Sequence, residues 1–190
     1  MRFAATILFV FSTCHAALSA DSAYTKLDLE NGCEFYQSDE MGGSAQCDGY
    51  KDYPVYFSEG DLRQTLRFGH VDPGSDHWES FGQFNHVNNT IEWRLGSSGK
   101  PFATILRWFI DDGDPDAKDG QVLVVSTVGS AANPVSCIAG YVDARANSNA
   151  NELARSVADS VAPVFKCGED LPSFYGERGP KAGDPTSLAN

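Results

Sequence analysis

The sequence predicts an α+β fold, in which one C-terminal amphipathic helix packs on an antiparallel, meander-like sheet of about six or seven strands. Three observations predict it. Apolar and polar residues alternate over 90–95, two further segments are apolar on both faces, and a helical apolar stripe runs through 149–162. A partly closed β-barrel carrying the same helix is the alternative.

The centre of the sheet is predicted within 84–128. Ile91, Trp93 and Leu95 alternate with polar residues, as in a strand with one buried face. Segments 102–110 and 122–128 are apolar on both faces, which is typical of strands covered above and below. We therefore expect a second layer over this part of the sheet.

Shorter strands are expected before the centre. Segment 24–29 has the pattern of an edge strand, 31–49 resembles a loop, and 53–57 reads as a strand that Pro54 places at an edge or a start. A turn at Glu59-Gly60 then leads into a strand over 61–68, with Leu62, Leu66 and Phe68 on its buried face.

The helix is expected between Asn149 and Ala162. Asn149 with Glu152 resembles a capping box, and Pro163 ends the helix. The apolar stripe of Leu153, Val157 and Val161 suits packing across the sheet.

Three regions organise the chain. Residues 1–20 have the pattern of an export signal, with cleavage after Ala20 or Ser19; a lipid anchor on Cys14 is the rival interpretation. Residues 21–167 form a single disulfide-braced domain. Residues 168–190, rich in glycine and proline, are expected to be a disordered tail on which Leu171, Phe174 and Tyr175 are the residues able to dock. No membrane span is expected after signal removal.

The chain is acidic, with a net charge of −12. Removing the signal takes away Arg2 and leaves 13 basic against 26 acidic side chains, a net charge of −13. Such a chain repels phosphates and anionic lipid surfaces, so nucleic acid is not an expected partner.

Four cysteines remain after the signal: Cys33, Cys47, Cys137 and Cys167. An even number in an exported chain indicates disulfides, with three possible connectivities. Proximity along the chain favours Cys33–Cys47 and Cys137–Cys167. A zinc site is disfavoured because no two cysteines have the C-x-x-C spacing.

Four arginines fall on predicted strands: Arg63, Arg67, Arg94 and Arg107. If these strands are neighbours, the guanidinium groups would form a basic patch for an anionic ligand or an acidic partner. The competing interpretation is cross-strand pairing with Glu59, Asp61 and Glu92.

The loop 111–120 is the candidate metal site. Asp112, Asp114 and Asp116 have the spacing of a calcium loop, but Ala117 replaces the required glycine and Leu123 the required glutamate. An irregular calcium site is the remaining possibility, against a solvated hairpin tip with no cofactor. The irregular segment 69–83 carries His70 and His77, whose spacing matches no known ligand pattern.

Several segments together resemble a family of uncharacterised exported α-proteobacterial proteins. They include Ser58-Glu59-Gly60-Asp61-Leu62-Arg63, Ile91-Glu92-Trp93-Arg94-Leu95, Lys100-Pro101-Phe102-Ala103-Thr104-Ile105-Leu106-Arg107-Trp108 and Asn149-Ala150-Asn151-Glu152-Leu153-Ala154-Arg155. The resemblance covers roughly residues 22–167 and implies a periplasmic or secreted location. The family has no established activity, so it implies no catalytic residue.

Two functions are therefore compared. The first is a non-catalytic periplasmic or secreted binding module that recognises a protein or an envelope component. The second is a small metal-dependent or hydrolytic enzyme that uses the 69–83 loop and the 111–120 acidic loop. The absence of a catalytic motif of any specificity favours the first.

Overall fold

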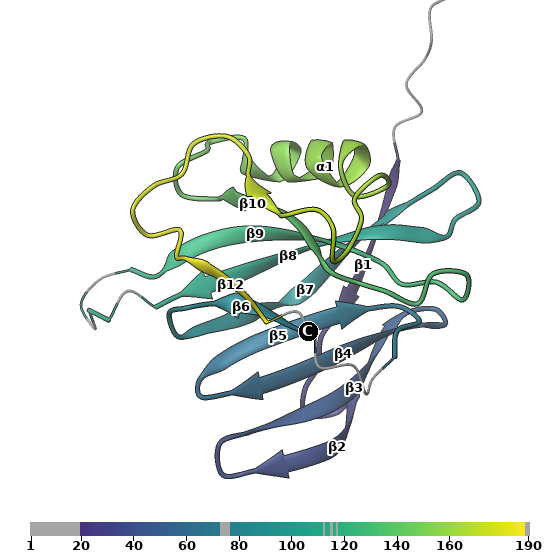
Figure 1. Ribbon diagram of the computed structural model, residues 1–190, viewed down its shortest axis with the longest axis horizontal. Coiled ribbons are helices and arrows are strands. Elements are labelled where there is room, and N and C mark those ends of the chain that lie inside the picture. The colour runs from purple at the N-terminus through teal and green to yellow at the C-terminus, as the bar shows by residue number, and fades with distance from the viewer. Residues whose placement is uncertain (1–19, 73–76, 112, 115, 117, 189–190) are drawn as a thin grey trace, which may run out of the picture.

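The computed structural model describes residues 20–72, 77–111, 113–114, 116 and 118–188 (Figure 1). The expected export signal, apart from Ala20, lies outside the described residues, and so does Asp112 of the expected calcium loop. Within the described part, no helix is long and apolar enough to cross a membrane.

Most of the predicted centre belongs to a six-stranded sheet with the order β1-β7-β8-β9-β10-β11. Its strands are β1 (Asp21–Lys26), β7 (Asn85–Leu95), β8 (Pro101–Ile110), β9 (Gly120–Thr127), β10 (Ile138–Asp143) and β11 (Ser173–Phe174). All neighbours pair antiparallel except β10 and β11, which are parallel. The predicted meander is confirmed for β7 to β10.

A second, four-stranded sheet has the order β2-β3-β4-β5. Its strands are β2 (Cys33–Asp39), β3 (Gly42–Tyr50), β4 (Tyr53–Gly60) and β5 (Arg63–Phe68). A third sheet pairs β6 (Trp78–Phe81) with β12 (Pro185–Leu188). The described residues therefore form sheets of six, four and two strands and no closed barrel, so the expectation of one sheet of six or seven strands is wrong in detail.

Two apolar cores explain why the central strands are apolar on both faces. The larger core lies between the six- and four-stranded sheets and includes Phe57, Phe68 and Trp93. The smaller core lies between the other face of the six-stranded sheet and α1 (Ala150–Ser160), and includes Val125, Ala154 and Val157. Figure 1 shows α1 over the six-stranded sheet, on the side away from β2 to β5.

The predicted helix is confirmed, but its capping differs from the expectation. Asn149 occupies the N-cap position, yet its side chain makes no capping hydrogen bond. Its backbone carbonyl instead accepts a 3.0 Å hydrogen bond from the Leu153 amide. Packing of the apolar stripe therefore stabilises this short helix more than its first turn does.

The segment 31–49 is a β-hairpin rather than the expected loop. Its glycines suggested a loop, but Gly42 serves a close approach between β3 and β4. A Cβ at this position would lie 1.9 Å from the carbonyl oxygen of Glu59. Cys33 and Cys47 are directly opposite each other in β2 and β3, and they form one of the two expected disulfides.

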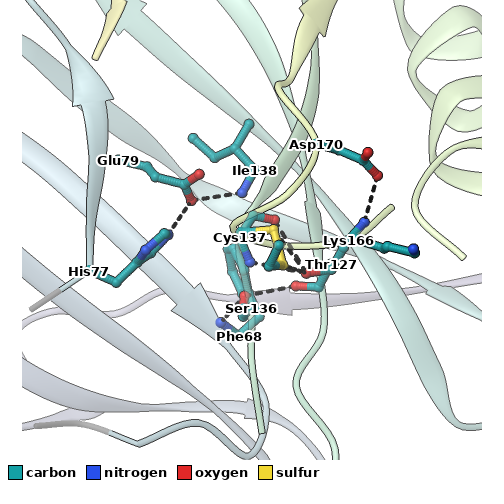
Figure 2. The surroundings of a disulfide bond; sticks show 10 residues. Phe68, His77, Glu79, Thr127, Ser136, Cys137, Ile138, Lys166 and Asp170 are labelled. Carbon is teal, nitrogen blue, oxygen red and sulfur yellow. Dashed lines mark hydrogen bonds and ion pairs between the residues drawn. A yellow bond between two sulfur atoms is a disulfide. The ribbon is translucent and has the colours of Figure 1, made fainter. Parts of the chain in front are cut away.

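The other expected disulfide joins Cys137 to Cys167 and so ties the start of β10 to the segment after α1. Figure 2 shows its surroundings, in which the hydroxyl of Thr127 accepts a 3.0 Å hydrogen bond from the Cys137 amide. The Ser136 hydroxyl donates to the carbonyl of Thr127 and accepts from the Phe68 amide. These bonds connect β5, β9 and the chain before β10.

The expected disordered tail is ordered over residues 168–188. β11 pairs with β10, β12 pairs with β6, and Ala182 is buried. The ring of Phe174 stacks on Tyr141 with centroids 5.1 Å apart, whereas Leu171 is 88% exposed. A segment poor in apolar residues is held because its polar backbone finds partners in the domain.

Candidate functional site

The four arginines of the expected basic patch do not share a face. Arg63 and Arg67 belong to β5 of the four-stranded sheet, while Arg94 and Arg107 belong to β7 and β8 of the six-stranded sheet. Arg63 pairs with Asp61, and an Nη of Arg67 donates to the carbonyl of Asp72 at 2.8 Å. The arrangement gives no support to a joint anion site.

Arg94 belongs to a polar network between β1, β7 and α1. Its side chain is only 5% exposed and donates to both carboxylate oxygens of Asp159, to Ser22 and to the carbonyl of Ala20. Glu92 accepts from Arg155 at 2.7 Å in the same network. Ion pairing therefore accounts for Arg94. Glu92 lies on the same strand as Arg94, so this pair differs from the cross-strand pairing of the competing interpretation.

The network shifts the ionisation of Glu92 and Arg155. Burial opposes ionisation of Glu92, but hydrogen bonds from Arg155 and Ser22 and the charge of Arg94 outweigh it and hold the pKa of Glu92 below its usual range. The hydrogen bond to Glu92 raises the pKa of Arg155. For Arg107, burial lowers the pKa, and its guanidinium donates to Gln121 at 2.9 Å.

Each histidine among the described residues contacts different neighbours. The ring of His70 lies 5.0 Å from that of Tyr53, and the ring of His86 stacks on Phe109 at 4.9 Å. His77 Nε2 lies 3.0 Å from a carboxylate oxygen of Glu79, which also accepts a 2.7 Å hydrogen bond from the Ile138 amide (Figure 2). Burial, and then the charge of Glu79, raises the pKa of Tyr141.

No group of three or more His, Cys, Asp or Glu side chains is placed to hold a metal ion among the described residues. Asp114 and Asp116 of the expected calcium loop are exposed, and the carboxylate of Asp114 accepts a 3.0 Å hydrogen bond from the Asp116 amide.

A different site appears where the hairpin turns meet at one end of the molecule. The β4–β5 turn is at Asp61-Leu62, two residues later than predicted, so Leu62 is at the turn rather than in the core. The turn was predicted at Glu59-Gly60 because glycine favours turns, but neither residue of the observed turn is a glycine. Asp61 and Leu62 adopt positive φ angles of 50° and 58°, and Leu62 is 60% exposed.

Three exposed apolar residues occupy this end, and we call Met41, Leu62 and Phe84 the turn-end patch. They are 66%, 60% and 42% exposed, respectively. The Asp61 amide donates to the carbonyl of Met41 at 3.1 Å, and the Asn85 amide donates to that of Leu62 at 3.0 Å. Figure 1 shows the β2–β3 and β4–β5 turns at the same end of the sheet. Backbone bonds therefore fix the three segments relative to one another.

A cavity of about 260 Å³ lies beside this patch. Its lining includes Leu62 and Phe84, with Gln64 and Asn85, and the carboxylates of Glu59 and Asp111. Gln64 donates to Glu59 at 2.8 Å and accepts from the Val87 amide at 2.8 Å, so it connects β4, β5 and β7. The cavity wall is thus held by hydrogen bonds before any ligand arrives.

A larger cavity of about 590 Å³ opens beside the Cys33–Cys47 disulfide. It is lined by polar residues, among them Gln46, Asp48, Lys51 and Asp52, with Tyr56 and His70. Its lining has both charge signs and offers no apolar anchor of the kind that Leu62 and Phe84 provide. The turn end is therefore the better candidate for recognition.

Comparison with known proteins gives no match: no protein-family model, curated protein or solved structure is significantly similar to this chain.

Proposed function

We propose that this chain is an exported, non-catalytic binding module that recognises a protein or envelope component through the turn-end patch. The resemblance to exported α-proteobacterial proteins, the signal-like residues 1–20 and the two disulfides support a periplasmic or secreted location. The separate surroundings of the three histidines give the enzyme alternative less support.

The conformation of Leu62 carries the proposal. An L-residue in the left-handed region costs roughly 1–2 kcal/mol, and hairpin turns of this kind favour Asn or Gly. Burial does not compensate the cost, because Leu62 is 60% exposed. Backbone strain that holds an apolar side chain in solvent beside a preformed cavity is typical of a recognition surface.

The test is capture of a partner from envelope extract with the full chain after signal removal. Leu62→Asn removes the apolar side chain and suits the turn, so this variant should stay folded and gain about 0.5–1 kcal/mol of stability. Leu171→Asn is the matched control, because Leu171 is 88% exposed outside the patch.

We expect the wild type and Leu171→Asn to retain the same partner and Leu62→Asn to lose it. Urea denaturation establishes in parallel that Leu62→Asn is folded. Equal retention by a folded Leu62→Asn variant would overturn the proposal.

A further inference from the structure

We propose that the partner presents a cationic, extended protein segment, in which a large apolar side chain is flanked by Lys or Arg. This inference rests on the proposed function and adds the chemistry of the partner. The apolar side chain would enter the cavity between Leu62 and Phe84, and the cations would face the carboxylates around it.

The size of the cavity indicates a side chain rather than a free small molecule. Its volume of about 260 Å³ is below the range of roughly 300–1,000 Å³ that is usual for small-molecule sites. A single apolar anchor in a pocket, surrounded by polar contacts, is the common pattern of a protein interface. The exposed Met41 extends the apolar surface on which the remainder of such a segment would lie.

The charge around the patch decides between partners. The carboxylates of Glu59 and Asp111 line the cavity, and exposed acidic residues lie in or beside both turns: Asp39, Glu40 and Asp61. Arg63, a nearby cation, is already paired with Asp61, and its guanidinium lies 4.9 Å from the centre of the Phe84 ring. His86 also lines the cavity, and its ring stacks on Phe109. The surface therefore presents an excess of negative charge around an apolar centre.

This charge disfavours the other occupants. A second copy of the chain would bring the same carboxylates face to face, in a protein whose net charge is −12. An anionic lipid surface would be repelled for the same reason. A segment with Lys or Arg beside its anchor is complementary to the site in both charge and polarity.

The probes are three fluorescent decapeptides, built from alternating Leu and Lys, alternating Leu and Glu, and alternating Ser and Lys. Fluorescence anisotropy measures their affinity for the full chain after signal removal. We expect the Leu-Lys peptide to bind at least about tenfold more tightly than either other peptide, since it alone supplies both features. Raising the salt from low to high concentration should weaken its binding.

Three variants locate the interaction. Leu62→Asn should weaken the Leu-Lys peptide about tenfold, and the double variant Glu59→Gln/Asp111→Asn about fivefold. The double variant Glu34→Gln/Asp48→Asn makes the same change of net charge at exposed positions outside the patch and should leave the affinity unchanged.

The outcomes separate the two proposals. If Leu62→Asn abolishes capture of the envelope partner, but the Leu-Lys and Leu-Glu peptides bind equally well, the binding function holds and the cationic partner is overturned. Failure of the Leu-Lys peptide to bind, or equal weakening by both double variants, overturns it as well. If Leu62→Asn also leaves capture intact, both proposals fail.

Discussion

Arg94 donates two parallel hydrogen bonds to Asp159, from Nε to Oδ1 at 2.8 Å and from Nη2 to Oδ2 at 2.7 Å. The pair joins β7 to the last turn of α1, and thus holds the helix against the sheet. Two parallel bonds of this kind fix orientation as well as distance.

We expect Arg94→Met to lower the free energy of unfolding by about 2–3 kcal/mol. Removing one partner of a buried pair commonly costs 3–5 kcal/mol, and we take a lower figure because the Asp159 side chain is 33% exposed and can regain water. Urea denaturation gives the value. Lys166→Met, which breaks a surface pair with Glu169, should change it by less than about 0.5 kcal/mol. Similar losses in both variants would contradict the expectation.

The lowered pKa of Glu92 predicts a specific loss of stability in acid. Because the folded pKa is below the ordinary value of 4.5, the ionised group stabilises the fold above that pH. This contribution declines as the pH falls from about 4.5 through the folded pKa. Stability measured across this range should therefore depend less steeply on pH in Glu92→Gln than in the wild type. Glu169→Gln, at an exposed position, should follow the wild-type curve. Parallel curves for all three proteins would exclude Glu92 as the cause.

Replacing Thr104 and Thr127 by valine should change the free energy of unfolding in opposite directions, because their hydroxyls differ in hydrogen bonding. Thr104 is fully buried, and its hydroxyl has no hydrogen-bond partner within the described part of the chain. Thr104→Val should therefore raise the free energy of unfolding by about 1 kcal/mol. Thr127→Val should lower it by about 1–2 kcal/mol, because the Cys137 amide loses its acceptor. Urea denaturation of both variants tests the contrast, and a destabilised Thr104→Val would show that the hydroxyl is satisfied.

Truncation after Cys167 should destabilise the domain by several kcal/mol. The missing segment contains Phe174, which stacks on Tyr141, and Gly179, whose amide donates to the buried carboxylate of Asp143 at 2.8 Å. Tyr141 would also gain solvent, so its raised pKa should fall toward the usual 10.0. Thermal unfolding and a tyrosinate absorbance titration measure the two effects. Leu171→Ser, altered at an exposed site of the same segment, should match the wild type in both. A truncated chain with wild-type stability would mean that the residues after Cys167 do not contribute to the stability of the domain.

Periodicity predicted the scaffold well, since β7 to β10 and α1 have strong apolar patterns that only a packed interior satisfies. The disulfides followed from chain proximity. The same reasoning failed where the backbone departs from common preferences. Leu62 resembled a core residue because it shares the period of Leu66, but the strand bounds and the φ angle show that the turn is there.

The candidate site was not predictable from local patterns for a second reason. Met41, Leu62 and Phe84 come from separate parts of the chain, and backbone bonds between turns bring them together. The partners of Arg94 are also distant, with Asp159 65 positions away. Such contacts depend on register and on sheet packing, which periodicity does not specify.

The pairing of β6 with β12 has a consequence for the order in which the molecule assembles. Gln83 and Asp184, next to these strands, are hydrogen-bonded although 101 positions separate them. Contacts between such distant segments form late, since the long intervening loop must close first. A chain that emerges from its N-terminal end therefore has β6 without its partner until 185–188 arrive. The two-stranded sheet is therefore completed only after residues 185–188 have emerged, and β6 must stay unpaired while the intervening hundred residues fold.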